Sequence, residues 1–317
     1  DKLIALARRC RKVPMVGRTH LQPAMPSSVG VWASAHAESL LDDWRLLKSA
    51  CEYNDACPLG SAAGYGVPLS IDRNLTARLL GFREPVHNVL YASNARGKCE
   101  SIILAAASQV MLSLSRLAED LILYSMPEFG YFRLPAEYCT GSSIMPQKRN
   151  PDVLELVRAK ARRVMGQAQE VMSVVAGLPG GYNRDLQETK EPFIEGLAST
   201  RASVRIMARL LGKTKVDRAA LLAGFTPEVF ATDYALELVK QGVPFRDAYR
   251  QVRQGLQALE RRDPAKAIAE KKHVGAPMGL DFPAYSRRVR DAMRWVSGEQ
   301  RRCEAVEAKL MKGMVQA

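Results

Sequence analysis

The chain has 317 residues, of which 47% are hydrophobic and 25% charged, so it is long enough for a large core and has the composition of an ordinary soluble protein. The formal net charge of +13 favours anionic partners, but lysine and arginine are spread without interleaved aromatic residues, which argues against nucleic acid. We find no apolar run long enough to span a bilayer and no signal peptide, so we expect no membrane partner.

Six cysteines are scattered along the chain. They have neither paired spacing nor neighbouring histidines, which argues against a disulfide framework and against a metal site. We therefore expect reduced thiols in a cytoplasmic protein. The cysteines are Cys10, Cys51, Cys57, Cys99, Cys139 and Cys303.

The chain opens on a helix already in progress. Residues 1–11 place apolar side chains at helical spacing with no cap before them, so we expect an N-terminal portion to be missing. Residues 14–26 (PMVGRTHLQPAMP) are punctuated by proline and glycine and are interpreted as a loop that carries Thr19 and His20. A long helix is predicted over residues 27–52.

Three long helical segments share an alternation of four and three residues between apolar positions. The alternation runs from Ile103 to Tyr124, from Leu154 to Val175 and from Phe193 to Leu211. It is typical of an a/d-like seam, and helices of this length predict an all-α fold, a long antiparallel helical bundle. Because a narrow seam cannot cover every apolar residue, we expect other faces to be buried between subunits.

Shorter helices are expected elsewhere. Residues 71–81 predict a short helix that Asp72 helps to cap, and the first of the three long helices above is expected to run over residues 93–124. From Val216 on, glycine and proline breaks predict short helices, and Thr226 with Pro227 reads as a cap and first helical position. We therefore divide the chain into a central long-helix bundle domain (1–215) and a small C-terminal helical domain (216–317).

The most informative stretch is 140–152 (TGSSIMPQKRNPD). Its glycine and proline indicate a loop, and Asn150 followed by Pro151 predicts a helix start at the end of that loop. A helix N-terminus offers free N–H groups and a positive dipole end that suit a carboxylate, and Lys148 adds a full charge. Two adjacent hydroxyls, Ser142 and Ser143, could move a proton.

Two further polar stretches lie at predicted helix ends. Residues 17–22 read GRTHLQ, and residues 182–188 read YNRDLQE after a glycine-rich break. Glu155 lies just inside the helix that follows the 140–152 loop. Each stretch alone is weak evidence, but together they predict a site built at the ends of a helical bundle.

These stretches resemble a known family. Residues 141–151 (GSSIMPQKRNP) resemble the signature loop of the fumarase, aspartase and argininosuccinate lyase superfamily, and residues 17–26 (GRTHLQPAMP) resemble its second conserved stretch. QKRNPD followed by LEL, and then YNRDLQE, is similar specifically to the argininosuccinate lyases. The similarity covers residues 14–245, and the tail resembles the family's small third domain.

The resemblance implies an elongated helical-bundle homotetramer in which three subunits assemble each active site. It implies a lyase that takes a small anionic substrate, argininosuccinate, and releases fumarate and arginine by anti elimination, with no metal or organic cofactor. By resemblance, Ser142 is the general base, and Lys148 and Asn150 stabilise the aci-carboxylate intermediate. His20 pairs with Glu155 from another subunit. The substrate-binding positions are Thr19, Arg96, Tyr182, Arg184 and Gln187.

The residues alone leave alternatives open. Ser143 could be the base and Ser142 a cap, Glu155 could serve the helix dipole, and Arg184 could make a surface ion pair. The general acid that serves the leaving nitrogen also stays open, since His20 could instead position a water molecule.

The chain departs from the family pattern in three places. Around Arg96 it reads NARGK, where the family usually has an acidic residue before the arginine and Asp-Phe after it. Thr189 stands where an aspartate is common. The first conserved stretch of the superfamily, which belongs to its N-terminal domain, is not found. Because of these departures, two alternatives to an argininosuccinate lyase remain. One is a lyase for another N-substituted aspartate, and the other is a non-catalytic helical homologue.

Overall fold

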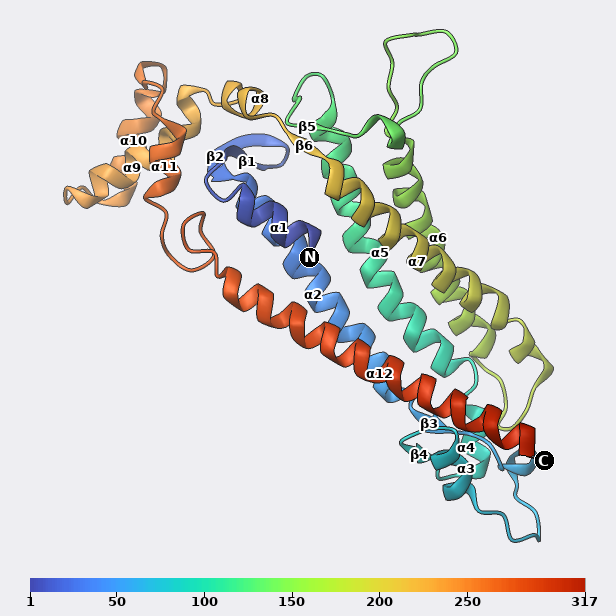
Figure 1. Cartoon of the computed structure of the whole chain (residues 1–317). Helices are drawn as coiled ribbons and strands as arrows, with labels where there is room; N and C mark the ends of the chain where they lie inside the picture. Colours follow the sequence, from blue (N-terminus) through green and yellow to red (C-terminus); the bar gives the residue numbers. More distant parts are fainter. Residues whose placement is uncertain (317) are drawn as a thin grey trace. The chain divides into compact units, whose positions relative to one another are not determined.

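The computed structural model describes residues 1–316, and it is dominated by long helices (Figure 1). The predicted all-α class, with long packed helices, is confirmed. The five long helices are α2 (Val29–Tyr53), α5 (Lys98–Ser125), α6 (Asp152–Val175), α7 (Lys190–Lys213) and α12 (Phe282–Gln316).

The remaining elements are short. The helices among them are α1 (Lys2–Arg9), α3 (Arg73–Leu79), α4 (Val89–Asn94), α8 (Arg218–Ala223), α9 (Ala231–Lys240), α10 (Phe245–Gln254) and α11 (Pro264–Ala269). The strands are β1 (Pro14–Thr19), β2 (Gln22–Ser28), β3 (Ala56–Cys57), β4 (Glu84–Pro85), β5 (Phe132–Arg133) and β6 (Lys215–Val216). The 3₁₀ turns are η1 (Ala62–Gly64), η2 (Ala136–Tyr138), η3 (Arg184–Gln187), η4 (Pro227–Phe230) and η5 (Leu256–Ala258).

The predicted seams lie in the core along most of their length. In α5 the seam positions from Ala107 to Leu121 are at most 8% exposed, and in α6 those from Leu154 to Val171 are at most 5% exposed. Burying one such leucine or valine contributes about 1.5–3 kcal/mol, so the seams hold the helices. The seam of α7 is less complete, because Val204 is 42% exposed while Met207 is buried.

The chain forms two compact units. Unit 1 contains Asp1–Glu38, Leu117–Glu155 and Met207–Ser286, and unit 2 contains Ser39–Arg116, Leu156–Ile206 and Arg287–Ala317. The predicted domain boundary near residue 216 stays a prediction. The expectation of short helices beyond Val216 holds for α8 to α11, which have six to ten residues, but is wrong for α12, which has 35. No proline follows the first turn of α12, and its lone interior glycines are tolerated.

The predicted loop at residues 14–26 is a β-hairpin, which corrects the sequence interpretation. Strands β1 and β2 pair antiparallel from Pro14 opposite Ser28 to Thr19 opposite Gln22, with a bulge at Gly17 and Arg18. Prolines obscured the strand pattern, since proline lacks an N–H for pairing. A two-stranded ribbon has only edge strands, and these tolerate proline.

The hairpin rests on the C-terminal part of unit 1. Val16 packs in a buried cluster with Phe225, Val229 and Phe230, which come from η4 and the turn before it. The ammonium of Lys271 donates to the carbonyl of Pro26 at 2.9 Å. The hairpin is therefore held by an apolar cluster and by one long-range hydrogen bond.

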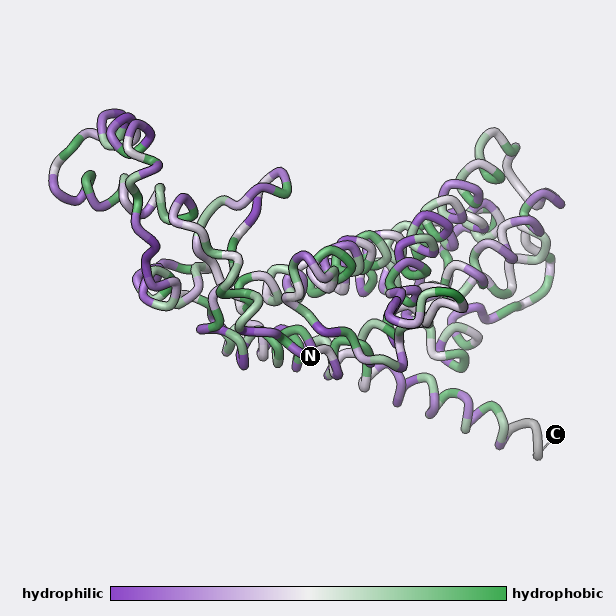
Figure 2. The backbone as a smooth tube through the Cα atoms, turned by 90° about the horizontal axis from the view of Figure 1, so that it is seen from above, coloured by the Kyte–Doolittle hydropathy of each residue, from purple (hydrophilic) through white to green (hydrophobic). Residues whose placement is uncertain are grey.

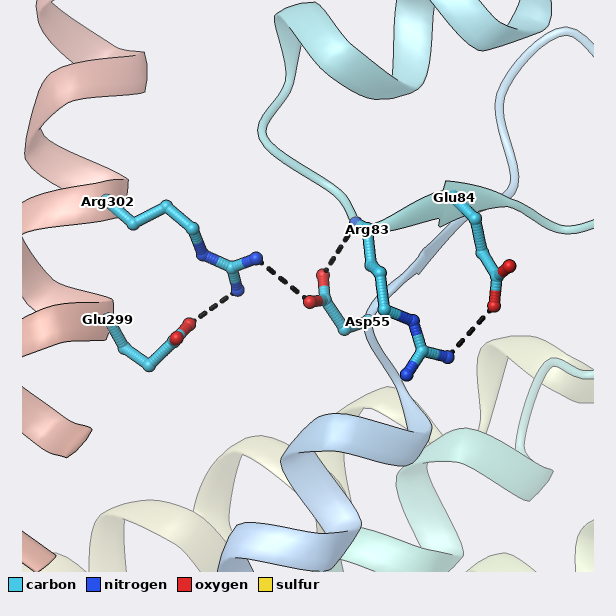
Figure 3. Close-up of polar contacts among 5 residues, drawn as sticks. All are labelled: Asp55, Arg83, Glu84, Glu299 and Arg302. Carbon is cyan, nitrogen blue, oxygen red and sulfur yellow. Dashed lines mark hydrogen bonds and ion pairs between the residues drawn. The ribbon is translucent and has the colours of Figure 1, made fainter. Parts of the chain in front are cut away.

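In unit 2 a polar network joins α12 to the segment after α2 (Figure 3). Arg302 donates to Asp55 at 2.9 Å and to Glu299 at 2.5 Å, and Asp55 also accepts from the backbone of Arg83 at 3.4 Å. Farther back along α12, Trp295 packs edge-on against Trp44. Hydrophilic and hydrophobic positions alternate along this helix (Figure 2), which indicates one face that packs and one that does not.

Helix starts follow the predicted caps in part. Asp72 accepts from the backbone of Leu75 at 2.8 Å and begins α3, and Thr226 precedes Pro227 at the start of η4, as predicted. The helix expected near residue 93 is instead divided into α4 and α5. Gly97 lies between the two helices and has a φ of +75°, in the left-handed region. Only glycine adopts such a backbone at little cost, so the break is local in origin.

Helix α5 is, within the described chain, long and apolar enough to cross a membrane by length and composition alone. The expectation that no segment reaches that threshold is therefore wrong. Half of its most apolar stretch is buried inside the structure. Core helices of proteins can have the same length and composition, so the finding is weak evidence for a membrane span.

Candidate active site

The 140–150 loop is closed at its base by a two-residue bridge. Thr140 and Asn150 exchange backbone hydrogen bonds of 3.1 and 2.8 Å. The predicted cap is one residue off: the N–H groups of Leu154 and Glu155 bond to the carbonyl of Pro151, so Pro151 caps α6. Asn150 is engaged in the bridge instead, and its side-chain amide donates to Gly141 at 3.4 Å.

Ser142 lies inside this loop with its hydroxyl oxygen held by backbone donors. The oxygen accepts from the N–H of Ile144 at 3.3 Å and from the N–H of Met145 at 3.1 Å. These bonds fold the turn, and the same two donors would stabilise negative charge on that oxygen. Ser143 accepts no such bond within residues 1–316, so the geometry distinguishes the two hydroxyls.

The rest of the loop is open to solvent. Ile144 is 86% exposed at its tip, Met145 is 42% exposed, and Lys148 is exposed. The backbone N–H of Lys148 donates to the carbonyl of Met145 at 3.1 Å, which continues the turn begun at Ser142. The loop therefore offers one serine oxygen and one ammonium close in sequence, beside the N-terminus of α6.

His20 and Thr19 lie at the exposed tip of the hairpin. His20 and Leu21 form its two-residue turn with φ values of 53° and 62°, in the left-handed region that disfavours side chains. Arg18 supports the turn by donating to the carbonyl of Leu21 at 2.9 Å while its guanidinium lies 4.8 Å from the ring centroid of Phe129. The fold thus maintains a strained backbone where the candidate imidazole is presented.

Glu155 lies in the first turn of α6 and is exposed, as is His20. Within the described part of the chain no hydrogen bond or ion pair joins His20 to Glu155. Their predicted pairing involves another subunit, so it stays a prediction.

A second group of candidates lies in unit 2 around Tyr182. Gln187 donates to the phenolic oxygen of Tyr182 at 3.0 Å, and the guanidinium carbon of Arg96 lies 5.1 Å from the ring centroid. The hydrogen bond from Gln187, together with the charges of Arg96 and Arg184, lowers the pKa of the Tyr182 phenol. Four predicted residues are thus gathered into one cationic, hydrogen-bonded group.

Sequence reasoning missed two residues that support this group. The side-chain oxygen of Asn94 accepts from the backbone of Gly181 at 2.6 Å, which joins the Arg96 break to the loop of Tyr182. Lys190 donates to Gln187 at 2.7 Å and orients its amide. The unusual NARGK run was the available signal for Asn94. Thr189, the other departure, is buried and donates to the carbonyl of Leu186 at 3.0 Å.

The candidates therefore form two groups, each inside one unit. Unit 1 contains Thr19, His20, Ser142, Lys148, Asn150 and Glu155, and unit 2 contains Arg96, Tyr182, Arg184 and Gln187. Among the described residues no cluster of histidine, cysteine and carboxylate side chains is arranged to hold a metal ion. The expectation of a cofactor-free reaction stays an expectation.

Comparisons with known proteins place the chain among lyases. The model of the family described as lyase (Lyase_1) matches residues 1–166. The chain is 48% identical over 287 residues to argininosuccinate lyase of Sorangium cellulosum, covering 90% of this chain and 66% of the relative. It is 45% identical over 244 residues to argininosuccinate lyase of Thermotoga neapolitana, covering 77% and 61%. It therefore spans about two thirds, or slightly less, of these curated relatives.

Solved structures show the same fold at low identity. An EDDS lyase in complex with formate superposes with a TM-score of 0.89 at 20% identity, over 99% of this chain and 71% of that one. A class II fumarase from Schistosoma mansoni superposes with a TM-score of 0.69 at 20% identity, over 89% and 65%. The fold is therefore shared across this group of lyases.

Proposed function

The chain belongs to the lyase family, and on that premise we propose that it performs the argininosuccinate lyase reaction, releasing fumarate from argininosuccinate to leave arginine. The similarity to argininosuccinate lyases at 45–48% identity supports the substrate. The observation that carries the proposal is the Ser142 hydroxyl, whose oxygen accepts two backbone N–H groups in the signature loop.

Ser142 acts as the general base in this proposal. It removes the proton from the carbon next to a substrate carboxylate, and the electron pair left on that carbon passes into the carboxylate. A free serine is a poor base, so its alkoxide must be stabilised. The N–H groups of Ile144 and Met145 provide fixed donors that need no reorganisation when the charge forms.

Lys148 and Asn150 stabilise the resulting aci-carboxylate, which carries two negative charges. The exposed ammonium of Lys148 and the positive end of α6 supply charge of the required sign. The electron pair then returns to form the fumarate double bond while the carbon–nitrogen bond breaks. His20, paired with Glu155 from another subunit, supplies the proton to the departing nitrogen or positions the water that does so.

Thr19, Arg96, Tyr182, Arg184 and Gln187 bind the substrate in this proposal. Arginines hold carboxylates with two parallel hydrogen bonds, which suits a substrate with several carboxylates. The working enzyme is a homotetramer in the cytoplasm whose active sites combine residues of several subunits, and it uses no cofactor.

A second candidate is a lyase for another N-substituted aspartate. Asn94 stands in the run before Arg96 that departs from the usual family pattern. Its side chain accepts a hydrogen bond from Gly181 in the loop of Tyr182, so the departure lies next to proposed substrate-binding residues. Such a change next to a substrate-binding arginine would alter recognition of the leaving amine.

The deciding experiment supplies the purified chain with argininosuccinate or with adenylosuccinate and follows fumarate by ultraviolet absorbance. We expect release from argininosuccinate with a clear preference over adenylosuccinate. A preference for adenylosuccinate would overturn the proposed substrate in favour of the second candidate. Release from neither substrate would support the non-catalytic alternative for this chain.

A further inference from the structure

A pocket of about 570 Å³ lies in unit 1 beside the hairpin, and the proposed reaction does not use it. Its walls come from β2, α9, α11 and the segments on either side of α11. Its volume lies in the range that protein pockets use for small molecules. The lining contains four carboxylates and four lysine or arginine side chains, so their charges balance.

Two cations of the lining are paired with carboxylates of the lining, and these ion pairs form part of the pocket wall. Arg262 makes two hydrogen bonds to the Glu237 carboxylate and lies over the ring of Tyr234, so both charges are satisfied. The hydrogen bonds from Arg262 lower the pKa of Glu237. Lys271 lies 3.4 Å from one oxygen of Asp233 and donates to Pro26. These groups shape the pocket and leave little charge for a ligand.

Other polar groups of the pocket lack partners. The second carboxylate oxygen of Asp233 is buried without a hydrogen bond. Lys240, Lys266 and Glu270 are exposed, and none makes a hydrogen bond or ion pair within residues 1–316. The unpaired Asp233 oxygen is enclosed, so a ligand in the pocket does not reach it. The unpaired groups that line the pocket and remain accessible are the Glu270 carboxylate, which can accept from an ammonium group, and the ammonium groups of Lys240 and Lys266, which suit a carboxylate.

We propose that this pocket binds a free amino acid with an apolar side chain. Its ammonium group donates to Glu270, and its carboxylate lies against Lys240 and Lys266. Its side chain lies on the apolar lining contributed by Met25, Leu236 and Ala267. Because the lining is charge-balanced, a zwitterion complements it better than a simple anion or cation would. The site goes beyond the proposed lyase reaction and does not depend on it.

The test uses L-leucine and carbon-13 methyl NMR of the methionines in the full chain. Met25 lines the pocket and reports on it, while Met145 reports on the signature loop. We expect a saturable shift of Met25 with a Kd in the millimolar range or tighter. The matched analogues 4-methylpentanoate and 3-methylbutylamine, which carry only the carboxylate or only the ammonium, should bind at least about tenfold more weakly.

Variants identify the contacts. Lys266→Ala and Glu270→Gln change exposed side chains, so the fold should persist, and each should weaken leucine binding about tenfold. Lys272→Ala, an exposed neighbour outside the pocket lining, is the matched control and should bind normally. No shift of Met25, equal binding of either analogue, or unchanged binding in both pocket variants would overturn the proposal. Because binding is read without turnover, an inactive chain would not affect this result.

Discussion

The backbone N–H of Met145 donates to the hydroxyl oxygen of Ser142 at 3.1 Å. This hydrogen bond helps to fold the signature loop, and it also places a donor on the oxygen of the proposed base. A donor fixed by the backbone stabilises an alkoxide without moving. The same donor also folds the turn, so a loop that retained its shape but lost the N–H would separate the two roles.

Replacing the Met145 amide by an ester removes that N–H and keeps the side chain. We expect kcat for fumarate release to fall about 10²-fold, in line with the loss of one oxyanion donor elsewhere. An ester at Gln147, whose N–H makes no hydrogen bond within residues 1–316, is the matched control and should be nearly neutral. Equal losses in the two esters would indicate that the loop's shape matters and this donor does not.

The strained turn at His20 and Leu21 predicts a stabilising substitution. Leu21 is 69% exposed with φ of 62°, so its side chain contributes little burial and its backbone is unfavourable. We expect Leu21→Gly to raise the free energy of unfolding by about 1 kcal/mol in a denaturant titration. Leu21→Ala, which removes the same side chain but keeps Cβ, should show no gain. A destabilised glycine variant would contradict the turn geometry.

The ion pair between Lys271 and Asp233 predicts that Lys271 contributes to the stability of the fold. Asp233 and Lys271 have side chains only 15% and 20% exposed, so removing the ammonium leaves a largely buried carboxylate without its cation. We expect Lys271→Met to lower the free energy of unfolding by about 2 kcal/mol. The exposed neighbour provides the comparison: Lys272→Met should change it by less than about 0.5 kcal/mol. Similar changes in the free energy of unfolding for the two variants would show that the Lys271–Asp233 ion pair does not stabilise the fold.

Tyr182 predicts a pH-dependent signal. The Gln187 hydrogen bond and the nearby Arg96 and Arg184 hold the pKa of its phenol below the usual value of 10.0. The phenolate is thus favoured in the folded state, so folding gains stability as pH rises through the lowered pKa, and the gain is complete above 10.0.

A titration of phenolate absorbance, with Tyr182→Phe as the reference, isolates this group. We expect Gln187→Ala to move its midpoint upward, whereas Lys190→Ala, which removes only the partner of Gln187, should move it less. A midpoint at or above 10.0 in the unmodified chain would contradict the geometry around the ring.

Local sequence rules predicted the parts of the fold that depend on neighbours along the chain. The seams of α5 and α6 follow from apolar spacing, and Asp72 caps α3 because its side chain reaches the N–H of Leu75 in the first turn. The hairpin was not predicted, because its prolines obscure the alternation that indicates a strand. It is also stabilised by Phe225, Val229 and Phe230, which lie about 200 residues later in the sequence, so local rules do not reveal the contact. The cap at α6 was off by one residue because Asn150 pairs with Thr140 instead.

The candidate site was predictable to a similar extent. Tyr182 and Gln187 were named from one motif and are hydrogen-bonded, while Arg96 reaches them from a separate segment. Asn94 stands in the unusual NARGK run, but its contact to Gly181 was not predictable, because it depends on how two distant segments meet. The pairing of His20 with Glu155 from another subunit depends on assembly, which a single chain does not contain.

The measurement that tests the central claim most directly compares fumarate release by Ser142→Ala and Ser143→Ala. If Ser142 is the base, Ser142→Ala should lower kcat by about 10³-fold or more, while Ser143→Ala should stay within about tenfold of the unmodified chain. Circular dichroism of both variants should match the unmodified chain, since each change removes one loop hydroxyl. A Ser142→Ala variant with unchanged kcat, or a Ser143→Ala variant that alone loses turnover, would contradict the account.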